Sequence, residues 1–183
     1  MSQTEADLRR IIREETAFRV GSGFDVHRFA EGRPMILGGV EIECDVGLLG
    51  HSDADVVVHA AMDAVLGAAG LPDIGNLFPD TDEQFRGADS LELARRVAWA
   101  VHEAGWSIVN LDLAVMAEKP RLSPHVAIMR ERMGGAFGLE PWQIGIKATT
   151  MERLGFIGRS EGIAALATAL LRHYPSPSRE ETP

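Results

Sequence analysis

An aspartate and a histidine two residues apart could form part of a metal site near the start of the chain. Asp25 and His27 lie at the end of a segment with the composition of a strand, residues 18–26. Side chains two apart on a strand project to the same face, and a carboxylate and an imidazole are both zinc ligands. From this pair alone, a surface Asp and His that happen to alternate is the simpler interpretation.

A second polar group lies where a loop is expected to enter a helix, in residues 50–59. Asp55, His59 and Asp63 are spaced i, i+4 and i+8, so they share one stripe of that helix. Such a stripe beneath Val and Ala side chains is costly unless its groups are paired or bind a metal. A histidine on an apolar helix face is usually a hydrogen-bonded core residue. As a third ligand, however, His59 would complete an Asp-His-His set with an open fourth position, as in catalytic zinc sites.

Two further segments carry groups suited to phosphates and divalent cations. Residues 72–82 form an acidic, proline-containing stretch that is equally typical of a solvated loop. In residues 147–159, paired Thr hydroxyls, an Arg and free backbone N–H groups could bind phosphate, although a Thr-rich turn fits too. Glu152 could hold a hard divalent cation. Together these groups indicate metal-assisted phosphoryl chemistry.

The charge balance agrees with this chemistry and argues against other classes. The chain has 183 residues, with 27 Asp and Glu against 18 Lys and Arg and a net charge of −9. A net-negative protein gains no general attraction to nucleic acids or anionic membranes, and it needs metal ions to bind a polyanion. The single cysteine, Cys44, excludes an internal disulfide. With no secretory signal in view, we expect a cytoplasmic protein.

Strand-like and helix-like segments alternate along the chain. A Gly-Gly turn between two short apolar segments predicts an early hairpin, which disfavours a purely parallel sheet. We therefore expect an α/β fold (an α+β sandwich) in which one mixed sheet is covered by helices. The expected strands are 18–26, 35–37, 40–42, 111–116 and 143–148; the expected helices run from Ser52 or Asp53 to about Ala69, from Asp89 to Gly105, from Ser123 onward, and over 162–173.

The domain limits follow from composition. Residues 1–16 contain a weak amphipathic turn or two and are expected to form an N-terminal extension. Residues 17–173 are expected to form a single domain, since their length suits one core. Residues 174–183 have the proline and polar content of a disordered tail.

In order and spacing, five motifs resemble those of the 2-C-methyl-D-erythritol 2,4-cyclodiphosphate synthase family of the non-mevalonate isoprenoid pathway. They are GSGFDVH, GHSDADVVVHAAMDAVLGAAG, DIGNLFPDTD, AEKPRL and KATTMERLGFIGRSEG. The resemblance extends from residue 18 to residue 171. It implies a lyase that assembles as a homotrimer, with an active site at each subunit interface. It also implies a hydrophobic cavity on the trimer axis, which could take an isoprenoid diphosphate.

The resemblance implies roles for individual residues. Asp25, His27 and His59 match zinc ligands, and Glu152 matches the ligand of a magnesium or manganese ion on the diphosphate. His51 and Thr150 match the positions that stabilise the transition state. Further substrate contacts are implied for Val26, Ser52, Asp73, Ile74, Gly75, Phe78, Pro79, Asp80, Thr81, Asp82, Ala117, Glu118, Lys119, Pro120, Arg121, Leu122, Ser123, Ala148, Thr149, Met151, Phe156 and Arg159, and for the ligand residues themselves.

Three positions depart from the family pattern. Ser22 stands where a His is often found, Pro72 where a Gly usually precedes the DIG motif, and Arg121 where Lys is common. Ser22 and Pro72 are neighbours of the implied site residues and affect its fine geometry. Arg121 keeps the positive charge but changes its shape.

The family reaction converts 4-diphosphocytidyl-2-C-methyl-D-erythritol 2-phosphate to the 2,4-cyclodiphosphate and CMP. The 2-phosphate of the substrate attacks the β-phosphorus, so no side-chain base is needed and the protein positions and neutralises charge. Two alternatives remain open on the residues alone. One is a zinc-dependent phosphohydrolase, and the other is a non-catalytic trimer that binds isoprenoid diphosphates.

Overall fold

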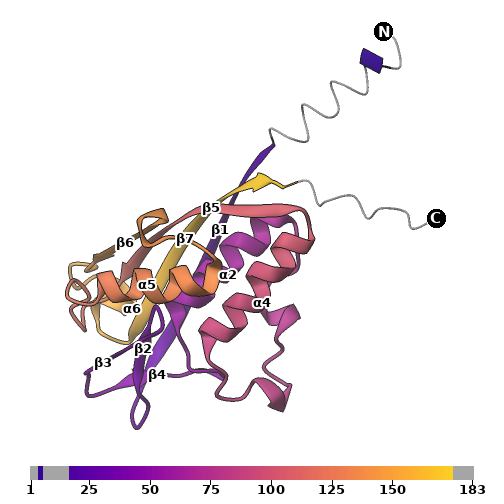
Figure 1. Ribbon diagram of the computed structural model, residues 1–183. Helices are drawn as coiled ribbons and strands as arrows, with labels where there is room; N and C mark the ends of the chain where they lie inside the picture. The colour runs from indigo at the N-terminus through magenta and orange to yellow at the C-terminus, as the bar shows by residue number, and fades with distance from the viewer. Residues whose placement is uncertain (1–3, 6–16, 175–183) are drawn as a thin grey trace.

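A five-stranded mixed sheet forms the centre of the fold, with strand order β4-β1-β7-β5-β6. The computed structural model describes residues 4–5 and 17–174 (Figure 1), so the predicted extension and tail lie almost wholly outside the described residues. Strand β7 pairs antiparallel with β1 and β5, whereas β5 and β6 are parallel, which confirms the predicted mixed sheet. The strands are β1 (Phe18–Ala30), β4 (Gly47–Leu48), β5 (Trp106–Met116), β6 (Ile144–Thr149) and β7 (Gly162–His173).

Helices cover one face of this sheet (Figure 1). Helix α2 packs on β1 and β7, α4 on α2 and β5, and α5 on α4 and β6. Apart from His59 and Asp63, helix α2 is apolar on all sides because it lies between the sheet and α4, and twelve of its residues are buried. The helices are α2 (Val56–Ala69), α3 (Ile74–Leu77), α4 (Ser90–Glu103), α5 (Val126–Phe137) and α6 (Gly155–Gly158), with 3-10 turns η1 (Glu83–Phe85) and η2 (Pro141–Gln143).

The predicted hairpin is present as a separate two-stranded sheet, β2 (Met35–Leu37) with β3 (Val40–Ile42). Its turn is made by Gly38 and Gly39, whose φ angles of 59° and 74° lie in the left-handed region that favours glycine. Because alternate residues of both strands are buried, the hairpin packs one face onto the core.

Residues 162–173 form strand β7, so the predicted helix was wrong. The Ala and Leu content of this segment favours a helix, but every second side chain from Ile163 to Leu171 is fully buried, the period of a strand. Strand β7 lies between β1 and β5 and pairs with both along most of its length. Pairing on two edges therefore overrides local helix propensity.

Several boundaries also differ from the predictions. Helix α2 begins after Asp55 rather than at Ser52 or Asp53, and the Asp55 carboxylate accepts hydrogen bonds from the N–H groups of Val57 and Val58. Helix α5 begins after His125 rather than at Ser123, because residues up to 125 form turns. The Gly70 stop and the Asp89 cap are confirmed.

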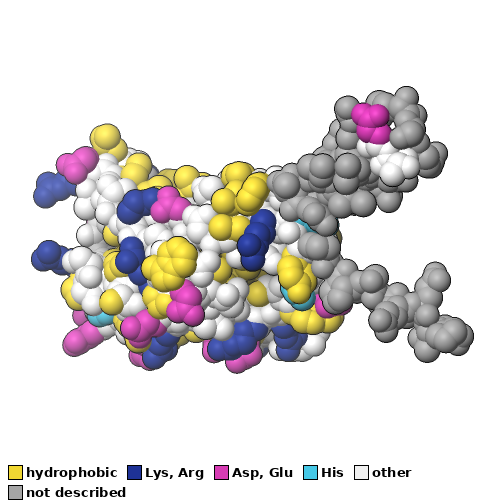
Figure 2. Space-filling view, turned by 45° about the horizontal axis from the view of Figure 1, so that its top comes forward, with side chains coloured by type: hydrophobic (Ala, Val, Ile, Leu, Met, Phe, Trp, Pro, Cys, Tyr) yellow, Lys and Arg dark blue, Asp and Glu magenta, His cyan; other side chains and the backbone are white. Residues whose placement is uncertain are grey.

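The face of β1 and β7 that bears no helix carries exposed apolar side chains. Phe24 is 56% exposed and its partner across the pair, Leu166, is 44% exposed. Val20 and Val26 lie on the same face of β1 and are also exposed. Figure 2 shows, on one face of the molecule, hydrophobic groups standing among basic and acidic side chains. A paired apolar stripe on a sheet is typical of an interaction surface.

Among the helices of the described residues, none combines the length and the hydropathy that crossing a membrane requires.

Candidate metal centre and active site

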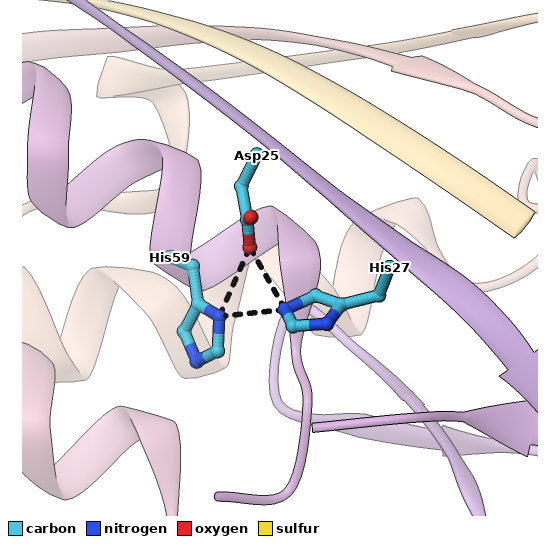
Figure 3. A group of neighbouring side chains, drawn as sticks. All are labelled: Asp25, His27 and His59. Carbon is cyan, nitrogen blue, oxygen red and sulfur yellow. Dashed lines mark hydrogen bonds and ion pairs between the residues drawn. The ribbon is translucent and has the colours of Figure 1, made fainter. Parts of the chain in front are cut away.

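Asp25, His27 and His59 bring three metal-ligating atoms together (Figure 3). The Asp25 Oδ2 atom lies 3.0 Å from His27 Nε2 and 3.0 Å from His59 Nδ1. The two imidazole nitrogens are 3.1 Å apart. One carboxylate oxygen and two imidazole nitrogens converging on one point fit a divalent transition metal such as zinc.

Two packed elements supply these ligands. Asp25 and His27 lie on the face of β1 that meets α2, and the intervening Val26 points to the uncovered face. His59 lies one turn into α2 and reaches across from the helix. β1 and α2 approach closely because Gly21 and Gly23 lack side chains: a Cβ at Gly23 would lie 2.1 Å from the carbonyl oxygen of Ala60. The predicted same-face pair and the third ligand therefore meet.

The backbone determines which nitrogen of His27 faces the cluster. His27 Nδ1 lies 2.7 Å from the carbonyl oxygen of Leu49. A carbonyl only accepts, so Nδ1 carries a proton; in the neutral ring Nε2 is then the nitrogen free to bind a metal, and in the charged ring it donates to Asp25. A backbone carbonyl on the far nitrogen is the usual support of a metal-ligating histidine.

Mutual attraction shifts the pKa values of this cluster. Burial by itself raises the pKa of the Asp25 carboxyl, but hydrogen bonds and charge from His27 and His59 outweigh burial and hold that pKa well below its usual range. Burial lowers the pKa of His27, and the Asp25 carboxylate more than reverses this, so the His27 pKa lies above its ordinary value. The cluster therefore favours positive charge beside an ionised carboxylate.

The predicted helix stripe does not act as a unit. Asp55 is the N-cap of α2, and its carboxylate accepts from four backbone N–H groups. Asp63 accepts a hydrogen bond of 2.9 Å from the N–H of Ile74, which ties α2 to the α3 loop. Only His59 of the three joins the metal ligands, and backbone donors satisfy the two carboxylates.

A cavity of about 450 Å³ opens in front of the three ligands. Most of the residues that line it belong to the predicted site: Asp25, His27, His51, Ser52, His59, Ile74, Gly75, Phe78 and Asp80. The ring of His51 lies with Nε2 3.2 Å from the carbonyl oxygen of Asp82. Asp73, Pro79, Thr81 and Asp82 flank these positions in sequence but do not line the cavity. The cavity combines apolar walls with the polar Asp25, His27 and His59 cluster, and ligand sites commonly combine such groups.

Four lining residues were not predicted as site residues: Gly50, Met62, Phe85 and Leu93. Met62 could have been found, because it lies one turn after His59 on α2 and so shares its face. Phe85 comes from η1 and packs edge-on against Phe78, with ring centroids 5.3 Å apart. No sequence signal links η1 or α4 to this cavity.

The remaining predicted site residues form a second group. Parallel pairing of β5 and β6 brings the loops after the two strands together, with the N–H of Ala117 donating to the carbonyl of Thr149 at 3.0 Å. Glu118 Oε1 accepts from the N–H groups of Met151 and Arg153, at 2.9 and 3.3 Å. A carboxylate thus holds one loop against the other.

The loop that carries Glu152 is exposed and conformationally strained. Glu152 and Arg153 have φ angles of 51° and 63°, in the left-handed region that non-glycine residues rarely adopt. Glu152 Oε1 accepts a hydrogen bond of 3.0 Å from Thr150 Oγ1. Such strain is common at ligand-binding turns.

Within one described chain, no residue of the second group lines the cavity. The cavity beside the metal ligands is lined only by residues between 25 and 93. The second group comprises Ala117, Glu118, Lys119, Pro120, Arg121, Leu122, Ser123, Ala148, Thr149, Thr150, Met151 and Glu152, with Phe156 and Arg159 exposed nearby in sequence on and after α6.

The model of the YgbB family matches residues 18–172, which include every candidate metal ligand and both loop groups. The chain belongs to the YgbB family. It is 58% identical over 154 residues to the 2-C-methyl-D-erythritol 2,4-cyclodiphosphate synthase of Synechococcus elongatus, covering 84% of this chain and 96% of that protein. The synthase of the same name from Bacillus velezensis is 52% identical over 155 residues, covering 85% and 98%.

Solved structures support the same family assignment. The IspF–CDP complex of Plasmodium falciparum is 31% identical, with a TM-score of 0.76, and the match covers 87% of this chain and 98% of that one. The bifunctional IspDF of Campylobacter jejuni is 45% identical, with a TM-score of 0.84, over 87% of this chain and 43% of that one. The family resemblance expected from the motifs is therefore confirmed.

Proposed function

We propose that this protein converts 4-diphosphocytidyl-2-C-methyl-D-erythritol 2-phosphate to 2-C-methyl-D-erythritol 2,4-cyclodiphosphate and CMP. One observation carries the proposal: Asp25, His27 and His59 converge in the lining of a cavity, in a chain 58% identical to a synthase of that name. The family includes a solved complex with CDP, which contains the nucleotide part of the proposed substrate. As the products are a cyclic diphosphate and CMP, the enzyme is a phosphorus–oxygen lyase.

Two metal positions would offset the negative charge of the substrate. Asp25, His27 and His59 would hold zinc, and Glu152 would hold magnesium or manganese. When bound, these ions supply Lewis-acid polarisation of the β-phosphate and offset charge on the diphosphate. The attacking 2-phosphate belongs to the substrate and is already a nucleophile, so the side chains position the reacting groups and exclude water.

The cavity and the loops would bind different parts of the substrate. Ser52, Ile74, Gly75, Phe78 and Asp80 line the cavity and would hold the methylerythritol phosphate. The loops at residues 117–123 and 148–152 would hold the cytidine diphosphate, through backbone N–H groups and the positive charge of Arg121. His51 and Thr150 would donate to phosphate oxygens as charge develops.

Within one chain the second group does not line the cavity, which supports a homotrimer whose subunits complete each other's sites. The exposed apolar stripe that includes Phe24 and Leu166 supports the same assembly, because it supplies a surface to bury between subunits. Native mass spectrometry should then give about three times the chain mass of 19.9 kDa. A monomer at micromolar concentration would contradict the assembly.

Turnover of the authentic substrate tests the function. The purified protein, loaded with zinc and magnesium, should release CMP and the cyclic diphosphate in equal amounts, as identified by phosphorus NMR. Release of an open phosphate monoester would instead identify a phosphohydrolase. Binding without any release would identify a non-catalytic protein.

A further inference from the structure

A hydrogen-bonded network connects His59 through Ser90 to Asp53, on the side of the His59 ring that faces away from Asp25. Ser90 is the first residue of α4 and is fully buried. Its Oγ lies 3.0 Å from His59 Nε2, the ring nitrogen on the far side from Asp25. The same Oγ donates a hydrogen bond to Asp53 Oδ1. Neither Ser90 nor Asp53 lines the cavity.

Asp53 is held in place as an acceptor. Its Oδ2 accepts from the N–H of Ser90 at 3.0 Å, and its Oδ1 accepts from the N–H of Asp55 at 3.2 Å. Both carboxylate oxygens therefore face donors. Through these bonds Asp53 joins the start of α4 to the residue that caps α2.

The protons available on His59, Ser90 and Asp53 determine the tautomer of His59. A serine hydroxyl has one proton, and a carboxylate has none. Of these two groups only the hydroxyl can donate, so the serine proton lies between Ser90 Oγ and Asp53 Oδ1. Ser90 Oγ can then only accept from His59, so His59 Nε2 carries the proton. A neutral imidazole carries one proton, so its Nδ1 presents a lone pair beside Asp25 Oδ2 and His27 Nε2, an arrangement that suits a cation bound between the three atoms.

The opposite arrangement is unfavourable at two places. If Ser90 donated to His59 Nε2, its oxygen and the Asp53 carboxylate would face each other without a proton. His59 Nδ1 would also carry a proton at the point where the metal must bind, and that proton would have to leave on metal binding.

We propose that Ser90 and Asp53 are positioning residues that hold the proton on His59 Nε2 and so prepare His59 Nδ1 as a metal ligand. The inference rests on the proposed function only in its premise that a metal binds Asp25, His27 and His59. It has a consequence for Ser52, whose Oγ accepts from Ala54 N and lies 3.2 Å from His59 Nε2. Ser52 then accepts from the same ring N–H, and its own proton is available as a donor into the cavity.

Zinc affinity of the full chain tests the proposal without substrate. Ser90→Ala removes the acceptor, and Asp53→Asn replaces one carboxylate oxygen with a donor. Each change is expected to weaken zinc binding about 10- to 100-fold in competition with a chromogenic chelator, as found for outer-shell partners of metal-bound histidines. The double variant should lose little more zinc affinity than either single variant, because both changes disrupt the same hydrogen-bonded network.

A matched control separates tautomer control from a loosened helix. Asp89 caps α4 by accepting from Leu91 N, and within the described residues its side chain makes no hydrogen bond to Ser90 Oγ or His59. Asp89→Ala should weaken the helix start while leaving zinc affinity within about twofold of the parent, since outer-shell effects require direct contact with the ligand. An equal loss of affinity in this control would overturn the proposal, as would unchanged affinity in both Ser90→Ala and Asp53→Asn.

The tautomer itself can be read by NMR. Long-range proton–nitrogen spectra of the metal-free protein with isotope-labelled histidine, at about pH 9 where an ordinary imidazole is neutral, distinguish the two ring nitrogens. The His59 signals are those missing from His59→Ala. They should show an Nε2–H tautomer in the parent and a shift toward Nδ1–H in Asp53→Asn. An Nδ1–H tautomer in the parent would overturn the proposal. Failure of turnover with both results as expected would count against the proposed reaction alone.

Discussion

Asp55 Oδ1 accepts a hydrogen bond of 2.9 Å from the backbone N–H of Gly38, seventeen residues earlier in the chain. Its other oxygen accepts from the N–H of Gly39 at 2.6 Å, and Oδ1 also accepts from Val57 and Val58. One fully buried carboxylate thus caps α2 and closes the turn of the β2–β3 hairpin. The helix that carries His59 is joined in this way to a distant hairpin.

Asp55→Asn should lower the free energy of unfolding by about 1–3 kcal/mol. The amide has one acceptor oxygen in place of two, so at least one buried N–H loses its partner. Urea unfolding followed by circular dichroism measures the change. Asp45→Asn, in the loop between β3 and β4, is a suitable control and should change stability by less than about 0.5 kcal/mol. A variant as stable as the parent would contradict the role of Asp55.

The free energy of unfolding should depend on pH differently in the parent and in Asp55→Asn. Burial raises the pKa of Asp55 from 3.8 to about 6, against the opposing effect of its backbone donors. A carboxyl whose folded pKa is raised binds its proton more tightly when folded, so its contribution to stability falls as pH rises from about 4 to about 6. The stability gap between parent and Asp55→Asn should narrow over that interval. A gap that widens would show that the folded pKa is lowered instead.

Gly23→Ala should unfold the protein or destabilise it by more than about 3 kcal/mol. Its Cβ would lie 2.1 Å from the carbonyl oxygen of Ala60 and 2.6 Å from Ala64 N, both backbone atoms of α2 that cannot yield locally. Gly67→Ala is the control, because only Ser22 O lies as near as 4.0 Å. That change in an exposed part of α2 should stabilise by about 0.5–1 kcal/mol. Thermal unfolding of both variants measures these two changes in stability.

His59→Ala should abolish stoichiometric zinc binding while the protein stays folded. Removing His59 leaves only Asp25 and His27, too few ligands for a tight site. Zinc content by native mass spectrometry and folding by circular dichroism give the two readings. His125→Ala, outside the cluster, should retain one zinc per chain. One zinc per chain in His59→Ala would refute the ligand assignment.

Glu152→Gln should reduce turnover at least about 100-fold with normal zinc content. The amide keeps the shape of the side chain but lacks the charge that a hard cation requires. Turnover at low magnesium, with zinc measured in parallel, tests this. Glu131→Gln, on the exposed side of α5, should leave turnover unchanged. Near-parent turnover of Glu152→Gln would contradict the proposed second metal position.

Mixing His59→Ala with Glu152→Gln should restore activity if each site is built from two subunits. The first variant lacks the zinc half of the site and the second lacks the nucleotide half. In trimers of random composition, roughly one interface in four joins two intact halves, so about a quarter of the parent activity should return. Each variant alone serves as the baseline. Activity that stays at baseline after subunit exchange, verified by mass, would place both halves in one subunit.

Much of the metal site could be predicted from spacing. Asp25 and His27 share a face because side chains alternate along any strand, and this holds wherever the strand packs. His59 follows a helix start by one turn, so its place on α2 was also predictable. The carboxylates of the same stripe were harder, because Asp55 and Asp63 accept from backbone N–H groups of distant segments.

Strand β7 shows where local patterns mislead. Ala and Leu in residues 162–173 favour a helix in isolation, yet this segment pairs with β1 on one edge and β5 on the other. The alternation of buried and exposed side chains was present in the sequence, but small residues on both faces obscured it. Hydrogen bonds to two neighbouring strands decided the outcome.

By itself the sequence determined the ligand types, their spacing on β1 and α2, the family and the charge that calls for metals. Those features depend on residue identity and on short-range geometry that every strand and helix repeats. Only the tertiary structure decided that Ser90, thirty-one positions from His59, would support its ring, and that Phe85 and Leu93 would wall the cavity. Such contacts depend on how α2, α4 and η1 pack together, because packing joins residues whose separation in the chain carries no periodic signal.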